Sequence, residues 1–346
     1  MMRLLIKVGG YTLMVGNNLK ILDHYYLRLA NNCFFVVVGN RHLGYGFIGY
    51  IKYCPLQEGS SIWASRGIPL ERLVKWYDAR EIHEYTPWKT YIPYYDAELP
   101  YVPMWLVTEF YNPVDRLLEI IRSPRDGLEQ EVIEVSTCLG SLIGGLDDVG
   151  VTGSLLPGIH NPLFSDIDLV VYGWRKGLDV VEAISENRDV FKPFTGSRLL
   201  EWSKRISERT GLTRRQVELL YRNWRRGVFN GREYSVTYSG NIHGSLSVLQ
   251  GFRTIGVTEI TAELSGGVDA LDYPSKSRIE RYRVIGGSNT PFDIVYVESF
   301  ESLYTPLLYE GGKAFIRGLL QCSQGLCKIL VGGVEEKGFI APGDTA

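Results

Sequence analysis

The chain has 346 residues, of which 45% are hydrophobic and 22% charged, and its formal net charge is −2. This apolar content supports folded cores and excludes wholesale disorder, and the neutral total argues against nucleic-acid binding over the whole surface. The longest apolar run, residues 33–38, falls far short of the roughly 20 residues of a membrane span. Charges at Arg3 and Lys7 leave no long apolar core for a signal peptide, so we expect a cytoplasmic protein of two or three domains.

The five cysteines, an odd number, do not form the framework of a secreted disulfide-rich domain. Only Cys322 and Cys327 are close in sequence. Their spacing is compatible with a disulfide that closes a hairpin and with two buried thiols. No other cysteine stands near enough to complete a metal set, and we favour thiols.

Residues 1–112 are predicted to form a β-rich N-terminal domain. Tyr, Val, Ile and Phe dominate short runs that Gly, Asn and Pro interrupt, as is typical of strands and turns. Residues 70–77 are the exception and predict a short helix.

The pattern changes at Asn112 and Pro113, which fit the N-cap and the first position of a helix. From here to residue 245 we predict an α/β core, in which residues 146–173 read as strand, loop and strand. Helices are expected over residues 114–122, 128–143, 178–184 and 198–209, the last with Ser197 as its N-cap. A further helix is expected from a capping box at Thr213 and Gln216 to about residue 226. A strand is expected at residues 232–238.

Residues 252–336 are predicted to form a small β domain that resembles a barrel, with an OB-like fold as the nearest analogy. The remaining residues, 337–346, are expected to form a loose tail. The candidate strands of this domain are residues 256–264, 278–285, 292–299, 313–320 and 327–331.

The most informative stretch joins a Gly-Ser turn to an Asp-x-Asp strand. Gly153 lets a backbone approach a phosphate closely, and Ser154 adds a hydroxyl and an amide. Asp166 and Asp168 are two apart in a strand, so their side chains share a face. Adjacent carboxylates repel each other unless cations lie between them and a bound anion, and Mg²⁺ is commonly held by one or two carboxylates together with substrate phosphates.

Each half of this pattern is weak alone, because most isolated Asp-x-Asp and Gly-Ser pairs are structural. Joined by eleven intervening residues between apolar strands, they resemble the nucleotidyltransferase superfamily that includes DNA polymerase β and the tRNA CCA-adding enzymes. Thr152 departs from the large apolar residue that precedes the glycine in that signature. More closely, the chain resembles an archaeal family of predicted nucleotidyltransferases, over residues 150–156 and 165–173 and more weakly over 48–55 and 99–116.

This resemblance implies an α+β protein in which a polymerase β-like core, a mixed sheet with helices, is flanked by the two β-rich domains. It implies that Gly153 and Ser154 contact an NTP, ATP among them, and that Asp166 and Asp168 are catalytic and hold two Mg²⁺ ions. The superfamily usually adds a third carboxylate on a neighbouring strand. Here Glu233, Asp293 or no residue at all fills that place.

A basic segment lies inside the neutral chain. Residues 198–232 hold ten Lys or Arg and three Glu, a local charge of +7. We favour polyanion contact for this excess, through Arg222, Arg225 and Arg226, with RNA as the first candidate. Three interleaved aromatics fit base stacking, but we favour burial in a core for them: Trp202, Tyr221 and Trp224.

Three further polar residues flank the motif. His160 precedes the carboxylates and is interpreted as a loop residue in preference to a general base. Arg175 and Lys176 follow the carboxylate strand, where contact with phosphate and a solvated surface pair fit equally well.

The leading hypothesis is an Mg²⁺-dependent nucleotidyltransferase that moves a nucleoside monophosphate from an NTP to a hydroxyl acceptor. The alternative is a non-catalytic RNA-binding protein with a degenerate nucleotide site. A third hypothesis is transfer to a small molecule or a protein side chain. The sequence leaves open the base, the acceptor and the oligomeric state, and it gives no indication of a membrane partner.

Overall fold

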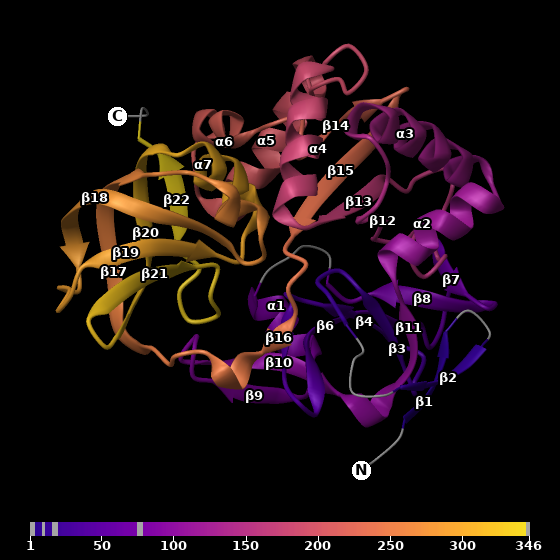
Figure 1. The fold of residues 1–346 in the computed structure, drawn as a ribbon, viewed down its shortest axis with the longest axis horizontal. Coiled ribbons are helices and arrows are strands. Elements are labelled where there is room, and N and C mark those ends of the chain that lie inside the picture. Colours follow the sequence, from indigo (N-terminus) through magenta and orange to yellow (C-terminus); the bar gives the residue numbers. More distant parts are fainter. Residues whose placement is uncertain (1–3, 9–10, 16–19, 75–78, 344–346) are drawn as a thin grey trace. The chain divides into compact units, whose positions relative to one another are not determined.

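The computed structural model describes residues 4–8, 11–15, 20–74 and 79–343, and it divides into two compact units. The first unit comprises Met1–Thr90, Leu99–Ala183 and Arg232–Leu246, and the second comprises Tyr91–Glu98, Ile184–Gly231 and Ser247–Ala346. It is a mixed α+β protein with a curled, largely antiparallel N-terminal sheet, a central mixed sheet with helices and a C-terminal barrel (Figure 1). The three-domain division with boundaries at residues 112 and 252 remains a prediction.

The N-terminal sheet curls into half a barrel, in the strand order β2-β1-β11-β3-β4-β6-β10-β9, and a β7–β8 hairpin pairs with β6 through β8. Strands β1 and β11 are parallel neighbours. Its strands are β1 (Leu4–Val8), β2 (Tyr11–Val15), β3 (Tyr26–Leu29), β4 (Phe34–Val37), β6 (Gly46–Pro55), β7 (Trp63–Ser65), β8 (Ile68–Arg72), β9 (Lys89–Ile92), β10 (Ala97–Pro103) and β11 (Val107–Tyr111). The prediction of a β-rich N-terminal region is thus confirmed.

Both faces of this sheet are covered. On β4, Phe35 packs into a core with Ile51, whereas Phe34 points to the other face and packs with Tyr26 and Tyr53. The second core also takes in two residues from the loop between the Gly-Ser turn and the Asp-x-Asp strand, Leu156 and Ile159. This packing fixes the underside of that loop on the N-terminal sheet.

The central sheet has the strand order β12-β13-β15-β14 and mixes both pairing modes, since β13 is antiparallel to β12 and parallel to β15. Its strands are β12 (Val149–Val151), β13 (Ile167–Tyr172), β14 (Arg226–Phe229) and β15 (Arg232–Ser239).

The helices of the described residues are α1 (Ala79–Tyr85), α2 (Pro113–Arg122), α3 (Gly127–Ile143), α4 (Trp174–Glu186), α5 (Gly196–Thr210), α6 (Arg214–Leu220) and α7 (Thr305–Glu310). The remaining short elements are the two-residue strands β5 (Arg41–His42) and β16 (Gly244–Ser245), which pair with each other, and four 3₁₀ helices: η1 (Met104–Leu106), η2 (Leu246–Val248), η3 (Val268–Leu271) and η4 (Ser302–Tyr304).

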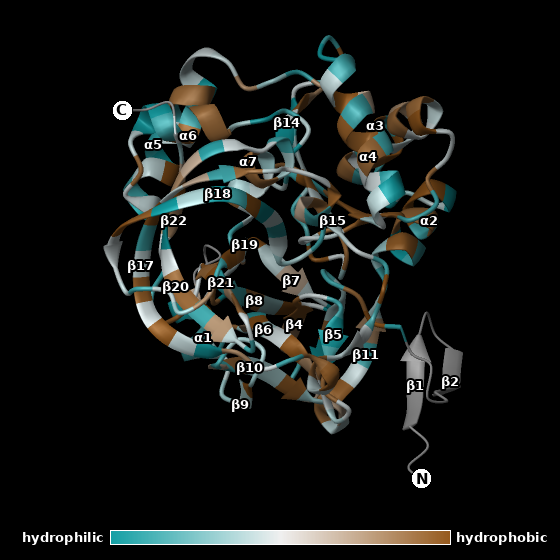
Figure 2. Ribbon diagram, turned by 60° about the vertical axis from the view of Figure 1, so that its left-hand side comes forward, coloured by the Kyte–Doolittle hydropathy of each residue, from teal (hydrophilic) through white to brown (hydrophobic). Residues whose placement is uncertain are grey.

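Side-chain caps explain where several helices begin. Asn112 accepts a hydrogen bond from the amide of Val114, and Pro113 then opens α2, as the sequence predicts. Asp126 caps α3 in the same way, and Gly144 ends it in the left-handed conformation. Figure 2 shows brown and teal residues alternating on α2, whose apolar side is buried.

The C-terminal strands form a barrel that pairing between β17 and β20 closes, as the predicted small β domain requires. The sheet order is β17-β18-β19-β21-β20, and β22 adds to β20 beyond the stretch that pairs with β21. Its strands are β17 (Arg253–Leu264), β18 (Ser275–Gly287), β19 (Ile294–Ser299), β20 (Gly312–Ser323), β21 (Leu326–Val331) and β22 (Phe339–Pro342).

Several local predictions were wrong. Residues 70–72 end strand β8, and residues 75–77 lie outside the described residues. Helix α6 has the predicted capping box but ends at Leu220, and α5 begins two residues earlier than the Ser197 cap would place it, with Thr195 at its N-cap. The expected tail contains β22, where Ile340 is fully buried.

The preference for thiols at Cys322 and Cys327 was also wrong. The two residues lie opposite each other where β20 pairs with β21, and they form a disulfide, as do Cys33 and Cys54. Cys138 is free. Because disulfides persist in oxidising compartments and inside hyperthermophiles, a cytoplasmic location remains only a prediction. Within the described ranges, every helix is too short or too polar to cross a membrane.

Candidate functional site

The Gly-Ser turn leaves strand β12 and closes directly over Asp168. The amide of Thr152 donates a 2.8 Å hydrogen bond to the Asp168 carbonyl. Gly153 follows in the left-handed region at φ +64°, and a Cβ atom there would lie 2.2 Å from Asp168 Oδ2. A glycine at this position therefore allows the turn to lie directly against the Asp168 carboxylate, because glycine has no side chain to collide with it.

The two aspartates belong to one end of β13. Asp168 lies within the strand and is partly buried, whereas Asp166 immediately precedes the strand and is exposed. Ile167 and Leu169 point into the core, with 0% and 1% of their surface exposed. The alternation of a strand therefore directs both carboxylates to the side away from that core.

A third carboxylate lies on the neighbouring strand. The parallel register of β13 and β15 pairs Ile167 with Tyr234 and Asp168 with Ser235, so one further step along this register sets Glu233 beside Asp166. The hydroxyl of Ser235 donates a short hydrogen bond to Asp168 Oδ1. Asp293, by contrast, belongs to the second unit and precedes β19.

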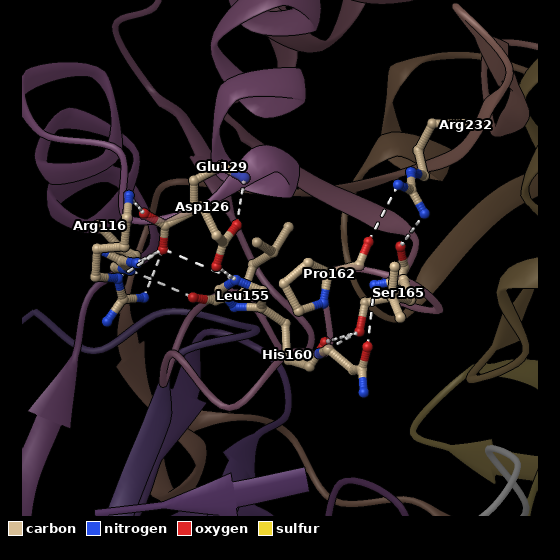
Figure 3. A network of polar contacts seen from close by, with 12 residues as sticks. Arg116, Asp126, Glu129, Leu155, His160, Pro162, Ser165 and Arg232 are labelled. Carbon is tan, nitrogen blue, oxygen red and sulfur yellow. Dashed lines mark hydrogen bonds and ion pairs between the residues drawn. The ribbon is translucent and has the colours of Figure 1, made fainter. Parts of the chain in front are cut away.

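The loop that joins the two motifs, residues 155–165, is fixed near the carboxylates by Arg232 (Figure 3). Its guanidinium donates to the carbonyls of Pro162 and Ser165, at 3.2 and 3.4 Å, and forms a two-point ion pair with Glu131 of α3, at 2.7 and 2.9 Å. The hydrogen bonds that Arg232 donates to Glu131 raise the pKa of Arg232, and the negative charge of Asp166 adds to that shift. One arginine at the start of β15 thus links α3 to the loop.

An ion network around the buried Glu129 holds the other end of the same loop, where Arg116 donates a hydrogen bond to the carbonyl of Leu155 (Figure 3). His160 and Asp126 are 2.9 Å apart, and the fully buried Glu129 pairs with both Arg116 and Arg125. Burial alone would raise the pKa of Glu129, but hydrogen bonds from Arg125 and the charge of Arg116 hold it below its usual value.

This cluster contains the acid and histidine atoms that a metal ion would need, because single ligand atoms of Asp126, Glu129 and His160 lie within 4.8 Å of one another. Two arginines already satisfy Glu129, however, and their charges repel a cation. The arrangement therefore acts as an internal ion network that shapes the loop. His160 serves in it as a loop residue.

A cavity of about 470 Å³ opens beside this network, next to Leu156 and Gly158 of the loop. Its charged walls are largely paired with each other: Arg66 forms a two-point ion pair with Glu109, and Arg116 reaches Glu119. The pairing leaves little net charge in the cavity to attract a charged ligand.

A group of residues on the N-terminal sheet lies within the electrostatic influence of Asp168, and the sequence did not predict it. Lys52 of β6 donates a 3.0 Å hydrogen bond to the hydroxyl of Tyr26. Burial and the nearby charge of Arg72 lower the pKa of Lys52 to about 8, and Asp168 partly offsets this effect. Burial and the charge of Asp168 also raise the pKa of Tyr53, to about 12. The one available signal was a lysine inside an otherwise apolar strand.

The three arginines of the basic segment belong to a different compact unit from the two aspartates. Arg222 forms a two-point ion pair with Glu310, and Arg222, Arg225 and Arg226 belong to the second unit, whereas the carboxylates belong to the first. Two of the three aromatics, Trp202 and Trp224, are buried with 9% and 2% exposed surface, as expected. The role of the three arginines in polyanion binding remains a prediction.

The basic pair after the carboxylate strand has local partners. Arg175 lies 5.0 Å from the ring centroid of Trp174, and Lys176 donates to the carbonyl of Gly145 at 3.4 Å. These contacts fit the interpretation of the pair as a surface feature.

No protein-family model matches the chain, and neither a curated protein nor a solved structure matches it.

Proposed function

We propose that this chain is a nucleotidyltransferase that moves a nucleoside monophosphate from an NTP, ATP among them, to a hydroxyl acceptor, with RNA as the first candidate. The observation that carries the proposal is the packing of Gly153 against Asp168, where a Cβ atom would lie 2.2 Å from the carboxylate. It supports a polymerase β-like core, because it joins a glycine-containing turn suited to phosphate with a carboxylate suited to a cation.

The residues present fit Mg²⁺ as the cofactor. Asp166, Asp168 and Glu233 offer only oxygen atoms from the ends of two adjacent strands, and hard cations prefer such ligands. When bound, two Mg²⁺ ions would supply charge neutralisation for the triphosphate and the attacking oxygen. In this proposal Asp166 and Asp168 hold them.

The chain's own residues would position the substrates. The amide and hydroxyl of Ser154 would donate to phosphate oxygens, and the missing side chain of Gly153 would admit them. Glu233 would accept the proton of the acceptor hydroxyl as its oxygen bonds to the α-phosphorus. The bond between that phosphorus and the oxygen bridging to the β-phosphate would break, and pyrophosphate would leave.

The test is transfer of label from each α-³²P-NTP, with Mg²⁺, to total RNA and to a panel of small molecules and proteins. Asp166→Asn and Asp168→Asn remove charge with little change of shape, and we expect each to lower transfer by about 100-fold or more. Asp189→Asn is the matched control, because Asp189 is exposed and outside the site.

Equal transfer by the wild type and the Asp168→Asn variant would refute the proposal. Binding of RNA without transfer to any acceptor would instead favour the rival function, an RNA-binding protein with a degenerate nucleotide site. A steep fall of that binding with salt, abolished by reversing the charges of Arg222, Arg225 and Arg226, would identify its surface. Transfer only to small molecules or proteins would identify the third class.

A further inference from the structure

Strand β6 carries a β-bulge at Lys52. Where β6 pairs with β4, Phe34 lies opposite Tyr53 and Phe35 lies opposite Ile51, so Lys52 is the extra residue. Bulges redirect side chains and are frequent beside active sites. Here the Lys52 ammonium lies 5.7 Å from the ring centroids of both Tyr53 and Tyr26.

Arg72 adds a second cation at the same place. The register of β6 and β8 pairs Arg72 with Tyr53, the residue next to the bulge. The Arg72 charge acts on Lys52 strongly enough to help lower its pKa, while Asp168 acts in the opposite direction. Lys52, Arg72 and Asp168 therefore share one electrostatic environment.

The charges in this environment are not balanced by ordinary ion pairs. Of the residues that the structure describes, no carboxylate lies within 4 Å of the cationic groups of Lys52 or Arg72. Two neighbouring cations repel each other, and desolvation adds to the cost. An anion bound between them relieves both penalties, most of all when Asp168 is engaged by a metal ion.

We propose that Lys52 and Arg72 form a polyphosphate cradle that binds the β- and γ-phosphates of the NTP, across from the Gly153-Ser154 turn. The proposal rests on the proposed function, since it names the residues of the same site that hold the leaving pyrophosphate. The hydroxyl of Tyr26, already bonded to Lys52, orients the ammonium. The N-terminal sheet then contributes directly to substrate binding and does not only support the fold.

The test is calorimetry with the α,β-methylene analogue of each of the four NTPs, in the presence of Mg²⁺. Lys52→Met and Arg72→Gln keep much of the side-chain volume and remove the charge. Each should raise the Kd of the triphosphate analogue by about 10- to 100-fold, the range for one charge-assisted hydrogen bond. The Kd of the corresponding nucleoside monophosphate should change by less than about threefold, because it lacks the two outer phosphates.

Two further variants keep the result interpretable. Lys89→Met removes a lysine from β9 of the same sheet and should leave the Kd unchanged. Lys52→Arg keeps the charge and should recover much of the affinity, which a variant that simply misfolds would not do; a thermal melt of each variant checks folding.

The outcomes separate the two proposals. Suppose that the wild type binds an analogue, that Asp168→Asn abolishes this binding, and that Lys52→Met and Arg72→Gln bind the analogue as tightly as the wild type. The cradle is then refuted and the proposed function stands. If the wild type binds none of the four analogues, the proposed function fails and the cradle fails with it.

Discussion

At the scale of single residues, Gly153 carries the most specific information in the chain. Its left-handed backbone conformation and the proximity of Asp168 both exclude a side chain. The first requirement is common to many turn glycines. The second ties the Gly-Ser turn to the carboxylate strand and is therefore the part that bears on function.

Gly153→Ala should lose stability and transferase activity together. The methyl group is strained by the positive φ, by about 1 kcal/mol, and must also displace the Asp168 carboxylate. Gly144→Ala is the control, since Gly144 has φ +73° with nothing within 4 Å of an added Cβ. We expect Gly144→Ala to be destabilised by about 1 kcal/mol with activity kept. Equal activity of both variants, measured beside urea denaturation, would contradict the packing argument.

A second prediction at this scale concerns pH. Burial lowers the pKa of His42 to about 4, against 6.5 when unfolded. Between these values the unfolded chain binds a proton that the folded chain does not, so stability must fall as pH falls from 6.5 to 4. The contribution of His42 over this window is about 3 kcal/mol.

The check is urea denaturation at several pH values for the wild type and His42→Asn, whose amide oxygen can still accept the hydrogen bond from Ile48. The variant should lose less stability than the wild type between pH 6.5 and 4, whatever its stability at neutral pH. Parallel curves for the two proteins would show that His42 does not titrate in this way.

At the scale of elements, the loop of residues 155–165 owes its shape to charged side chains from other parts of the first unit. Arg232 fixes its end, and the network around Glu129 fixes its start. The sequence placed Arg232 in a basic segment and suggested contact with a polyanion. Its ion pair with Glu131 could not be foreseen, because it joins residues 101 positions apart.

Arg232→Gln should loosen the loop end and lower transfer by about 100-fold, the effect of a displacement of about 1 Å at a reacting centre. Hydrogen exchange provides the direct readout: the amides of Phe164 and Ser165, which bond to the Asn161 carbonyl, should exchange faster. Arg214→Gln breaks an exposed pair with Glu218 and should change neither quantity. Unchanged exchange in Arg232→Gln would rule out this role.

The barrel supplies the clearest test of an element that the sequence missed. Ile340 of β22 is fully buried, whereas Ile242 is 74% exposed. Ile340→Ala should lower the free energy of unfolding by about 2–5 kcal/mol, and Ile242→Ala by less than about 0.5 kcal/mol. If residues 337–346 were a loose tail, the urea midpoints of the two variants would coincide.

The elements that the sequence predicted well are those with local signals. The cap at Asn112 and the capping box at Thr213 are read from neighbouring residues, and both are present. The strand β22 depends on pairing with the distant strand β20, and the Cys322–Cys327 disulfide depends on pairing across a hairpin. Such contacts leave little trace in composition or periodicity.

At the scale of the whole molecule, compactness and composition divide the chain differently. The change of composition lies near residue 112, but Leu99–Ala183 packs with Met1–Thr90 in one unit. The Gly-Ser turn, the carboxylates and the bulged lysine of β6 therefore belong to the same compact body. Composition could identify the first two, and only the fold associates Lys52 with them.

The small net charge of −2 likewise conceals local organisation. Acidic groups converge at the ends of β13 and β15, while the charges of Asp168 and Arg72 both act on Lys52 of the N-terminal sheet. A site of this kind needs cations and a polyanion together to be neutral. The central claim is therefore that metal and triphosphate bind jointly at this place.

The most direct test is the anomalous scattering of Mn²⁺ in crystals grown with the α,β-methylene NTP analogue that binds best. We expect a manganese peak at coordination distance, about 2.2 Å, from the carboxylates of Asp166 and Asp168, with the triphosphate against the Gly153-Ser154 turn. Manganese at the Asp126–Glu129–His160 cluster, or a nucleotide bound away from the two aspartates, would contradict it.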